Sequence, residues 1–363
     1  MKKIAFYLPQ FHSIPENDVW WGKGFTEWSN VKKAKSQFRR HYQPEIPYNN
    51  NYYCLLDSRV QEKQSEMALK YGIDGFCYYH YWFSGKKLLE KPMENMLCNK
   101  KIEIPFCICW ANESWARTWD GQEHKILIQQ NYDECKIAWK EHFDYLLPFF
   151  NDSRYIIDNN RPLIIIYKPH LIRKCREMLE YWNMLAAEAG FDGLYVGCQH
   201  PSSFNYNYRD MGIDFGIEFE PLYSLAEEKK ETDSIKKKIL YSVLHPHWLL
   251  WKMKRRLLHY PNVHDYDLIW NRIISRIPVD KSVAAGAFPS WDNTPRKGRD
   301  ADVFFQADPI KFRKYFQQRV QKAQKCYGVQ YLFINAWNEW AEGAHLEPDD
   351  KNGYGYLEAL KGN

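Results

Sequence analysis

Short apolar runs alternate with longer amphipathic runs along nearly the whole chain. Eight of the apolar runs have the length, the β-branched and aromatic content and the flanking turn residues of buried strands. They are Ile4 to Gln10, Gly75 to Tyr81, Pro105 to Trp110, Leu163 to Tyr167, Leu194 to Cys198, Phe215 to Phe219, Ala284 to Phe288 and Tyr331 to Ala336. Amphipathic runs between them predict helices. The clearest are Arg59 to Tyr71, Glu134 to Phe150, Ile172 to Ala189 and Pro309 to Tyr327.

Eight strands that alternate with helices are the number that closes a (β/α)8 barrel, the TIM barrel of the α/β class. An open, doubly wound sheet is the alternative, but the chain has no G-x-G-x-x-G or G-x-x-x-x-G-K-[ST] loop to accompany one. Barrels of this kind reach the length of 363 residues as one domain. We therefore expect a single catalytic barrel domain over residues 1–363, with a long helical insertion after the sixth strand, at about 222–282.

The insertion contains a basic amphipathic segment, Trp248 to Leu258, with two tryptophans. Such a pattern is typical of helices that lie on anionic membranes. The alternative, which we prefer, is a helix that packs on the barrel and leaves its basic face in solvent. The segment therefore predicts at most a peripheral contact with a membrane or a lipid-linked glycan.

The content of aromatic residues points to a ligand-binding site. They form 17% of the chain, with 15 Trp and 26 Tyr, which is more than a core needs. Sugar rings stack on indole and phenol faces, so the excess suits a saccharide site, although protein interfaces are also rich in Trp and Tyr. The charge does not suggest nucleic acid, since 50 basic residues nearly balance 45 acidic ones. We expect an oligosaccharide or polysaccharide as the partner.

Nine cysteines are scattered without a C-x-x-C pair, which indicates reduced thiols and a cytoplasmic protein. The N-terminal segment, Met1 to Pro9, has an apolar run too short for a signal peptide. No run approaches the roughly 20 apolar residues of a membrane span. We therefore expect a cytoplasmic location, at most peripheral to a membrane.

Polar and aromatic residues gather at the ends of seven predicted strands. They are Gln10 to His12, Tyr79 to Trp82, Trp110 to Trp115, Gln199 and His200, Glu218 to Glu220, Trp291 to Asn293, and Asn338 to Trp340. In a (β/α)8 barrel the C-terminal ends of the strands carry the chemistry. The seven segments are therefore expected to meet in one pocket.

Two carboxylates at the eighth strand end, Glu339 and Glu342, are the candidate catalytic pair. Breaking a glycosidic bond needs one carboxyl to protonate the departing oxygen and another to generate or stabilise the attacking group. Residues three apart on a strand point to opposite faces, so the pair requires a turn after Glu339, from which Gly343 permits the exit. A Glu-x-x-Glu spacing also occurs on solvated helices, but an apolar strand before it and the flanking Trp337 and Trp340 favour a site. Spacing alone leaves retention and inversion open.

Other strand ends supply candidate substrate contacts. Glu113 could instead form an ion pair with Arg117, and the residues around Asp292 are also good turn formers. Residues Glu27 and Trp28 and the run Tyr78 to Trp82 are walls of the pocket or core. The expected substrate-binding residues are His12, Trp28, Tyr81, Trp110, Asn112, Glu113, Trp291, Asp292, Arg296, Asn338 and Trp340.

Histidines also follow three strands, at positions His12, His80 and His200. They lack the H-x-H or H-E-x-x-H spacing of common metal sites. Three separate histidines are more often hydrogen-bonding residues. We expect no catalytic metal and no cofactor.

The segment from Asn338 to Gly343, followed by Leu346-Glu347-Pro348, resembles the catalytic segment of glycoside hydrolase family 99, the endo-α-mannosidase and endo-mannanase family. The resemblance to WbsX-type, family 99-like proteins of bacterial polysaccharide-biosynthesis loci runs nearly end to end. It is carried by Tyr7 to His12, Trp21 to Trp28, Trp110 to Glu113 and Trp291 to Arg296.

This resemblance implies a (β/α)8 barrel and an endo-acting, retaining cleavage of α-mannoside-like linkages without a covalent enzyme intermediate. The residue matching Glu339 would deprotonate the sugar 2-hydroxyl, which attacks its own anomeric carbon to give a 1,2-anhydro sugar. The residue matching Glu342 would protonate the leaving oxygen and then activate water. This chain has Ala341 where family 99 usually has His, so the resemblance leaves the sugar and the linkage open.

Two other functions remain as alternatives. WbsX-type proteins are often described as glycosyltransferases, which implies a role in building O-antigen or capsule. Against a transferase, the chain has no Gly-rich phosphate loop for a sugar nucleotide. A non-catalytic sugar-binding protein would explain the aromatic residues but would not need the paired carboxylates.

Overall fold

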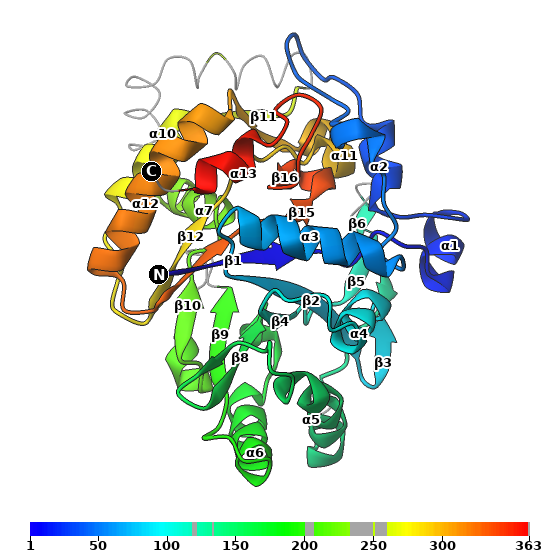
Figure 1. The fold of residues 1–363 in the computed structure, drawn as a ribbon, viewed down its shortest axis with the longest axis vertical. Helices are drawn as coiled ribbons and strands as arrows, with labels where there is room; N and C mark the ends of the chain where they lie inside the picture. Colours follow the sequence, from blue (N-terminus) through cyan, green and yellow to red (C-terminus); the bar gives the residue numbers. More distant parts are fainter. Residues whose placement is uncertain (118–121, 133, 200–206, 233–249, 251–259, 362–363) are drawn as a thin grey trace.

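Eight parallel strands form a closed barrel in the computed structural model of the protein (Figure 1). The strands are β1 (Lys2–Tyr7), β2 (Gly75–Phe83), β4 (Phe106–Trp110), β8 (Arg161–Ile166), β9 (Tyr195–Gln199), β10 (Phe215–Ile217), β12 (Val283–Ala287) and β14 (Tyr331–Ile334). Each pairs with the next, and β1 pairs with both β2 and β14, which closes the ring. The structure describes residues 1–117, 122–132, 134–199, 207–232, 250 and 260–361.

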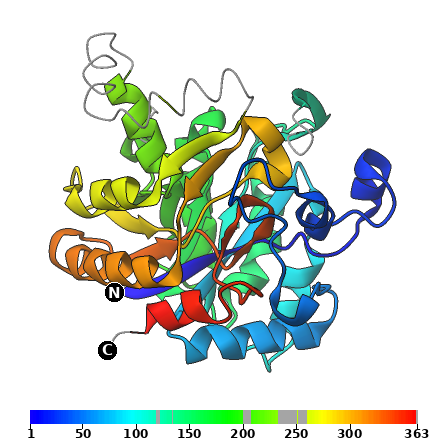
Figure 2. The same ribbon diagram turned by 90° about the horizontal axis from the view of Figure 1, so that it is seen from above.

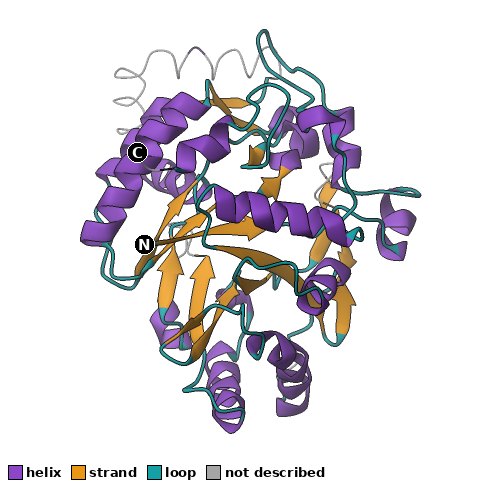
Figure 3. Cartoon of the chain, viewed as in Figure 1, coloured by secondary structure: helices purple, strands orange, loops and turns teal. Residues whose placement is uncertain are grey.

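Helices surround the barrel, as the views in Figures 2 and 3 show. They are α1 (Pro15–Trp21), α2 (Glu27–Lys33), α3 (Ser58–Lys70), α4 (Lys91–Cys98), α5 (Lys136–Phe150), α6 (Cys175–Glu188), α7 (Leu222–Thr232), α10 (Tyr266–Ser275), α11 (Thr294–Lys297), α12 (Pro309–Cys326) and α13 (Gly355–Leu360). Short strands lie outside the ring: β3 (Lys86–Leu88), β5 (Trp115–Arg117), β6 (Gln122–Ile128), β7 (Ile157–Asp158), β11 (Asn262–Asp265), β13 (Asp302–Phe305), β15 (Asn338–Glu339) and β16 (Ala344–His345). The predicted (β/α)8 barrel is confirmed, and all eight predicted strands are present within a few residues of their expected bounds.

Aromatic side chains fill the barrel interior below its C-terminal end. The Phe6 ring contacts the rings of Tyr79, Phe219 and Phe333, with centroid separations of 5.5, 5.2 and 5.7 Å. Phe6, Tyr79 and Phe333 lie on the neighbouring strands β1, β2 and β14, where alternate side chains point into the barrel, and Phe219 follows β10. They form a rigid apolar floor on which a site at the strand ends can rest.

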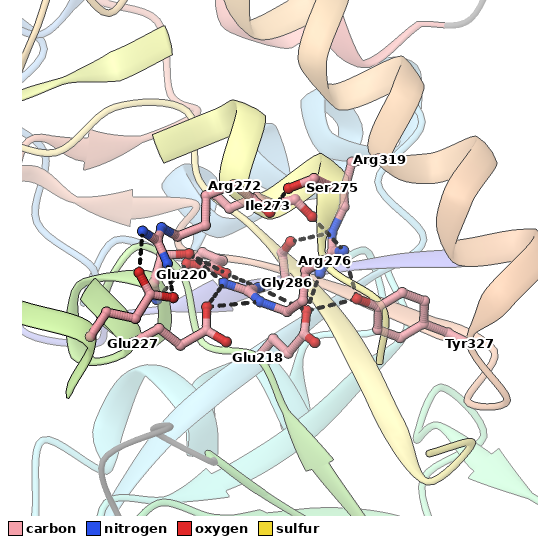
Figure 4. Close-up of polar contacts among 12 residues, drawn as sticks. Glu218, Glu220, Glu227, Arg272, Ile273, Ser275, Arg276, Gly286, Arg319 and Tyr327 are labelled. Carbon is pink, nitrogen blue, oxygen red and sulfur yellow. Dashed lines mark hydrogen bonds and ion pairs between the residues drawn. The ribbon is translucent and has the colours of Figure 1, made fainter. Parts of the chain in front are cut away.

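A buried ionic network fastens the helices after β10 to the barrel (Figure 4). Arg319 on α12 has no exposed surface and donates to the Glu218 carboxylate and, at 3.0 Å, to the Gly286 carbonyl. Arg276, directly after α10, donates to Glu218 at 3.1 Å and to Glu220 at 2.6 Å. Burying charges is unfavourable unless they are paired, so this network ties α10 and α12 to the end of β10.

The long connection between β10 and β12 is present as predicted and contains α7, β11 and α10. The expected basic helix, Trp248 to Leu258, falls outside the described residues apart from Leu250, so membrane contact through it stays a prediction. Within the described part of the chain, no helix has the length and apolar character needed to span a bilayer.

Candidate active site

The chain turns sharply after Glu339. Residues Asn338 and Glu339 form β15, Trp340 to Glu342 form a single 3-10 turn, and the chain returns in β16, which pairs antiparallel with β15. Gly343 leaves the turn with a φ of 58°, and a Cβ at this position would lie 2.8 Å from the Asp292 backbone nitrogen. The turn brings Glu339 and Glu342 to the wall of the same cavity, and it explains why glycine follows them.

The guanidinium of Arg296 connects the two carboxylates. Its Nη1 donates to Glu342 Oε1 at 2.6 Å, and its Nη2 donates to Glu339 Oε2 at 2.8 Å. Arg296 lies on the one-turn helix α11, after β12. Because the rigid planar fork fixes the directions of its N–H groups, it holds the two carboxylates in a defined relation.

A third carboxylate, from Glu27, lies beneath this pair. Glu27 has no exposed surface, and its Oε1 accepts from Arg296 Nη2 at 2.7 Å and from the Ala341 backbone N–H at 3.0 Å. Ala341 lies between the two catalytic candidates in the sequence. Glu27, the first residue of α2, therefore fixes both the arginine and the turn that carries the pair.

Burial dominates the protonation of the two candidates. Burial raises the pKa of Glu339 to about 8, against the attraction of the Arg296 guanidinium. Burial also raises the pKa of Glu342, again opposed by Arg296. Carboxyls whose pKa values are raised by burial suit general acid–base work.

Asp292 supports the site from behind. Its Oδ1 accepts from the Thr294 backbone N–H and hydroxyl, and its Oδ2 accepts from Gln43 and contacts His41 Nε2, both at 2.7 Å. The Asp292 N–H donates to the carbonyl of Glu342 at 2.7 Å. Asp292 thus orders the start of α11 and joins it to the catalytic turn.

The two carboxylates open into a cavity of about 370 Å³ at the C-terminal end of the barrel. Aromatic rings form much of its wall. They belong to Tyr79, Tyr81, Trp115, Tyr167, Phe219 and Trp291. The polar side chains are those of Gln10, Glu113, Ser114, Asn293, Arg296, Lys297, Glu339 and Glu342. Aromatic faces with a few convergent polar groups are the usual character of a small-molecule or sugar site.

Four of the expected substrate-binding residues line this cavity, namely Tyr81, Glu113, Trp291 and Arg296. Glu113 forms its ion pair with Lys168, and the side chain of Arg117, the partner considered from the sequence, lies outside the described part of the chain.

Seven expected residues do not line the cavity, and four of these are ring-bearing residues packed elsewhere. Trp28 donates to the Tyr53 carbonyl at 2.8 Å. Trp110 packs edge-on against His142, outside the barrel, at a centroid separation of 4.7 Å. Trp340 stacks on His345 at 3.7 Å. His12 is buried, and its Nδ1 faces the Pro9 carbonyl at 3.1 Å.

The other three are polar side chains occupied by the protein backbone or by neighbouring side chains. Asn112 bonds through both amide atoms to the backbone of Lys168 at 2.7 and 2.8 Å. Asn338 bonds in the same way to the backbone of Leu8 at 2.7 and 3.0 Å. Asp292 makes the contacts given above. These side chains stabilise the loops that carry the cavity.

Glu27, Tyr79 and Tyr167 are the important residues that sequence reasoning did not select. Alternation in β2 contained a signal for Tyr79, since it shares a strand face with Tyr81. The sequence pattern of the run that contains both tyrosines, like that around Glu27, fits either a pocket wall or the core. Glu27 lies 269 residues from Arg296 in the sequence, so no local pattern could connect the two.

Among the described residues, no group of three His, Cys, Asp or Glu side chains is arranged to hold a metal ion. The cavity itself brings together two carboxyls on one turn, a bridging guanidinium and stacking surfaces.

Comparisons with known proteins agree with this architecture. Over 99% of its length, the chain superimposes on a glycoside hydrolase-like protein with a TM-score of 0.60 and 13% identity, covering 92% of that structure. It superimposes on the GH99 endo-alpha-mannosidase from Bacteroides thetaiotaomicron with a TM-score of 0.56 and 12% identity, covering 99% of this chain and 95% of that one. At such low identity these likenesses show a shared fold.

Sequence relatives and a family model extend the comparison. The chain is 35% identical to uncharacterized protein WxcX of Xanthomonas campestris pv. campestris over 99% of its own length and 49% of the relative. It thus spans about half the length of the curated relatives that it matches. The model described as glycosyltransferase WbsX matches residues 3–360, so the chain belongs to the WbsX glycosyltransferase family.

Proposed function

We propose that the protein is an endo-acting glycoside hydrolase that cleaves α-mannoside-like linkages of a polysaccharide with retention of configuration. The single observation that carries the proposal is the pair Glu339 and Glu342 on one tight turn, bridged by Arg296 in an aromatic-walled cavity. Glycosidic cleavage requires two such carboxyls.

In the proposed reaction, Glu339 takes the proton of the sugar 2-hydroxyl, and the oxygen attacks the anomeric carbon of the same ring. Glu342 gives its proton to the departing oxygen, so the bond breaks and a 1,2-anhydro sugar forms. Glu342 then takes a proton from water, which attacks the anomeric carbon, while Glu339 returns a proton to the 2-oxygen. Both carboxyls end in their starting states, and one water is consumed.

Buried surroundings support these roles. The raised pKa of Glu339, about 8, makes its ionised form a stronger base toward a hydroxyl than an exposed glutamate. Burial raises the pKa of Glu342 and so favours its protonated form relative to an exposed glutamate, which is the form that a general acid needs. Arg296 stabilises whichever carboxylate is charged at each stage.

A glycosyltransferase is the second candidate, favoured by the description of the family that matches the chain. It would transfer a sugar to a growing O-antigen or capsule glycan. Arg296 is held among three carboxylates, which leaves it poorly suited to binding a nucleotide diphosphate. We therefore prefer the hydrolase.

Incubation with α-mannan and with bacterial cell-surface polysaccharides tests the proposal. Release of oligosaccharides whose new reducing ends form first as the α-anomer supports an endo-acting, retaining hydrolase. Turnover of nucleotide sugars without hydrolysis would support the transferase. Saturable glycan binding without any turnover would favour a non-catalytic protein. Glu134→Gln is the matched control for variants of Glu339 and Glu342, because it removes a partly exposed carboxylate that pairs with Arg173 and does not line the cavity.

We also propose a cytoplasmic location. Support comes from Cys77 and Cys107, which are buried cross-strand neighbours, and from Cys109 beside them. All nine cysteines are free thiols, which suits a reducing compartment.

A further inference from the structure

A second cavity of about 250 Å³ lies beside the candidate active site. Its walls come from the loop at 40–45, from residues 290–292, from the end of β13 and from the loop after β16. Trp291 lines both cavities, so the two are neighbours. Neither carboxylate of the proposed catalytic pair lines the second cavity.

The walls of this cavity combine ring faces with hydrogen-bonding groups. Tyr42, Trp291 and Phe305 supply aromatic surface. Trp291 is 3% exposed, and its indole N–H has no hydrogen-bond partner among the described residues. Glu45 uses its Oε2 to bond His345 at 2.8 Å, while its Oε1 makes no hydrogen bond within the described part of the chain. A buried unpaired donor and a half-used carboxylate are groups that a hydroxylated ligand satisfies.

The charge of the cavity wall restricts the class of ligand, because its positive and negative side chains balance each other. Both ring nitrogens of His345 face acceptors, Glu45 Oε2 and the Glu347 carbonyl. Burial is the largest single influence and favours the neutral ring, but the hydrogen bond and charge of Glu45, the charge of Asp349 and the hydrogen bond to the Glu347 carbonyl together outweigh it and raise the pKa of His345 to about 8. Three cations then accompany three carboxylates around the cavity: Arg40, His345 and Lys351 with Glu45, Asp292 and Asp349. A balanced wall does not favour a nucleotide diphosphate or another polyanion, whereas a neutral polyhydroxylated ring fits it.

The cavity also adjoins the catalytic turn. The His345 ring stacks on Trp340 with centroids 3.7 Å apart and an interplanar angle of 12°. Trp340 is the first residue of the turn that carries Glu342. A ligand that bonds Glu45 is therefore linked to the turn through His345 and Trp340.

We infer that this second cavity binds a neutral sugar residue of the glycan being cleaved, held against the Tyr42 and Phe305 rings and hydrogen-bonded by Glu45 and Lys351. The ligand's identity as part of the substrate rests on the proposed function. The second cavity gives the protein a preference for longer glycans, because a sugar bound outside the catalytic cavity contributes to binding.

Chain-length kinetics tests the inference through Tyr42→Ala. Tyr42 is 37% exposed, so its truncation leaves the core intact, and Tyr48, which is 40% exposed and does not line the cavity, provides the control Tyr48→Ala. Tyr42→Ala should raise KM about tenfold for long oligosaccharides and leave kcat, and KM for the shortest cleaved oligosaccharide, unchanged. Equal KM values for Tyr42→Ala and Tyr48→Ala on long chains would overturn the inference.

Ligand-observed NMR separates this inference from the proposed hydrolase. Saturation transfer to methyl α-mannoside, methyl α-glucoside and methyl β-galactoside is measured with the native protein and both tyrosine variants. The inference expects a signal that Tyr42→Ala reduces and Tyr48→Ala does not, even if no polysaccharide is cleaved. Equal signals in both variants for all three glycosides would contradict the inference and leave the hydrolase standing. Binding of GDP that is lost in Tyr42→Ala would also contradict it, because the cavity would then hold a nucleotide.

Discussion

Arg296→Met should destabilise the protein strongly at neutral pH and less at acid pH. The guanidinium contacts Glu27, Glu339 and Glu342 at 2.6 to 2.8 Å, and the Glu27 side chain has no exposed surface. Methionine keeps much of the arginine's volume but leaves the carboxylates without a cation. Loss of one partner from a buried ion pair typically costs about 3–5 kcal/mol.

The magnitude follows from proton uptake. A buried carboxylate without its cation must bind a proton, which costs about 1.4 kcal/mol for each pH unit above the ordinary glutamate pKa of about 4.3. One carboxylate that Arg296 keeps ionised therefore adds a penalty of about 3.7 kcal/mol at pH 7 and about 1 kcal/mol at pH 5. Glu339 adds little to this penalty at pH 7, because its pKa is already raised to about 8 in the native protein. For a chain of 363 residues the pH 7 penalty corresponds to a loss of about 5 °C in Tm.

Denaturant unfolding of the native protein, Arg296→Met and Arg299→Met at pH 5, 6 and 7 measures these penalties. Arg299 is exposed and three residues further along the chain, so Arg299→Met should stay within about 0.5 kcal/mol of the native protein. A penalty for Arg296→Met that is below about 1 kcal/mol at pH 7, or that fails to shrink toward pH 5, would refute the ionic cluster.

Three further results are expected. Gly343→Ala should cost about 1–2 kcal/mol of stability and lower kcat, because φ is 58° and the new Cβ would press on Asp292; unchanged thermal melting and kcat would argue against a strained turn. Arg319→Leu should cost about 3–5 kcal/mol in chemical unfolding, because it removes one of the two guanidinium groups that pair with buried Glu218, and part of the loss should be recovered in the double variant with Glu218→Leu; a purely additive double variant would exclude the coupling. The kcat/KM profile should rise toward pH 8 if Glu339 is the base, since a base with a raised pKa gains activity as pH rises through that pKa, whereas a fall through pH 8 would make it the acid.

The barrel was predictable because its strands are buried on both faces. Runs such as Leu163 to Tyr167 are then continuously apolar, and helical periodicity between the runs completes the pattern. The turn after Glu339 was predictable as well, since two carboxylates three residues apart cooperate only if the strand ends between them. Strand and helix periods depend only on residues that are close together in the sequence, so they can be recognised in a single sequence.

The site was predictable only in part, because the direction of a side chain at a strand end depends on alternation and on distant partners. Trp110 is paired in register with His80 on the neighbouring strand, and both point outward to His142, so the Trp110 ring packs behind the barrel. Asn112 and Asn338 looked like ligand-binding amides, but they hold neighbouring backbone. Polar side chains that order a loop and those that bind a substrate have the same local sequence signature.

Leaving-group dependence tests the central claim most directly, that Glu339 and Glu342 are the base and the acid of a glycosidase. The measurement is the pre-steady-state release of nitrophenol from a nitrophenyl α-mannobioside, compared with cleavage of a mannan oligosaccharide. Nitrophenol departs without a proton, so Glu342→Gln should retain its release while losing about 10² to 10⁴-fold on the oligosaccharide, and Glu339→Gln should lose both. Native rates in both variants, or loss of nitrophenol release only in Glu342→Gln, would contradict the assignment.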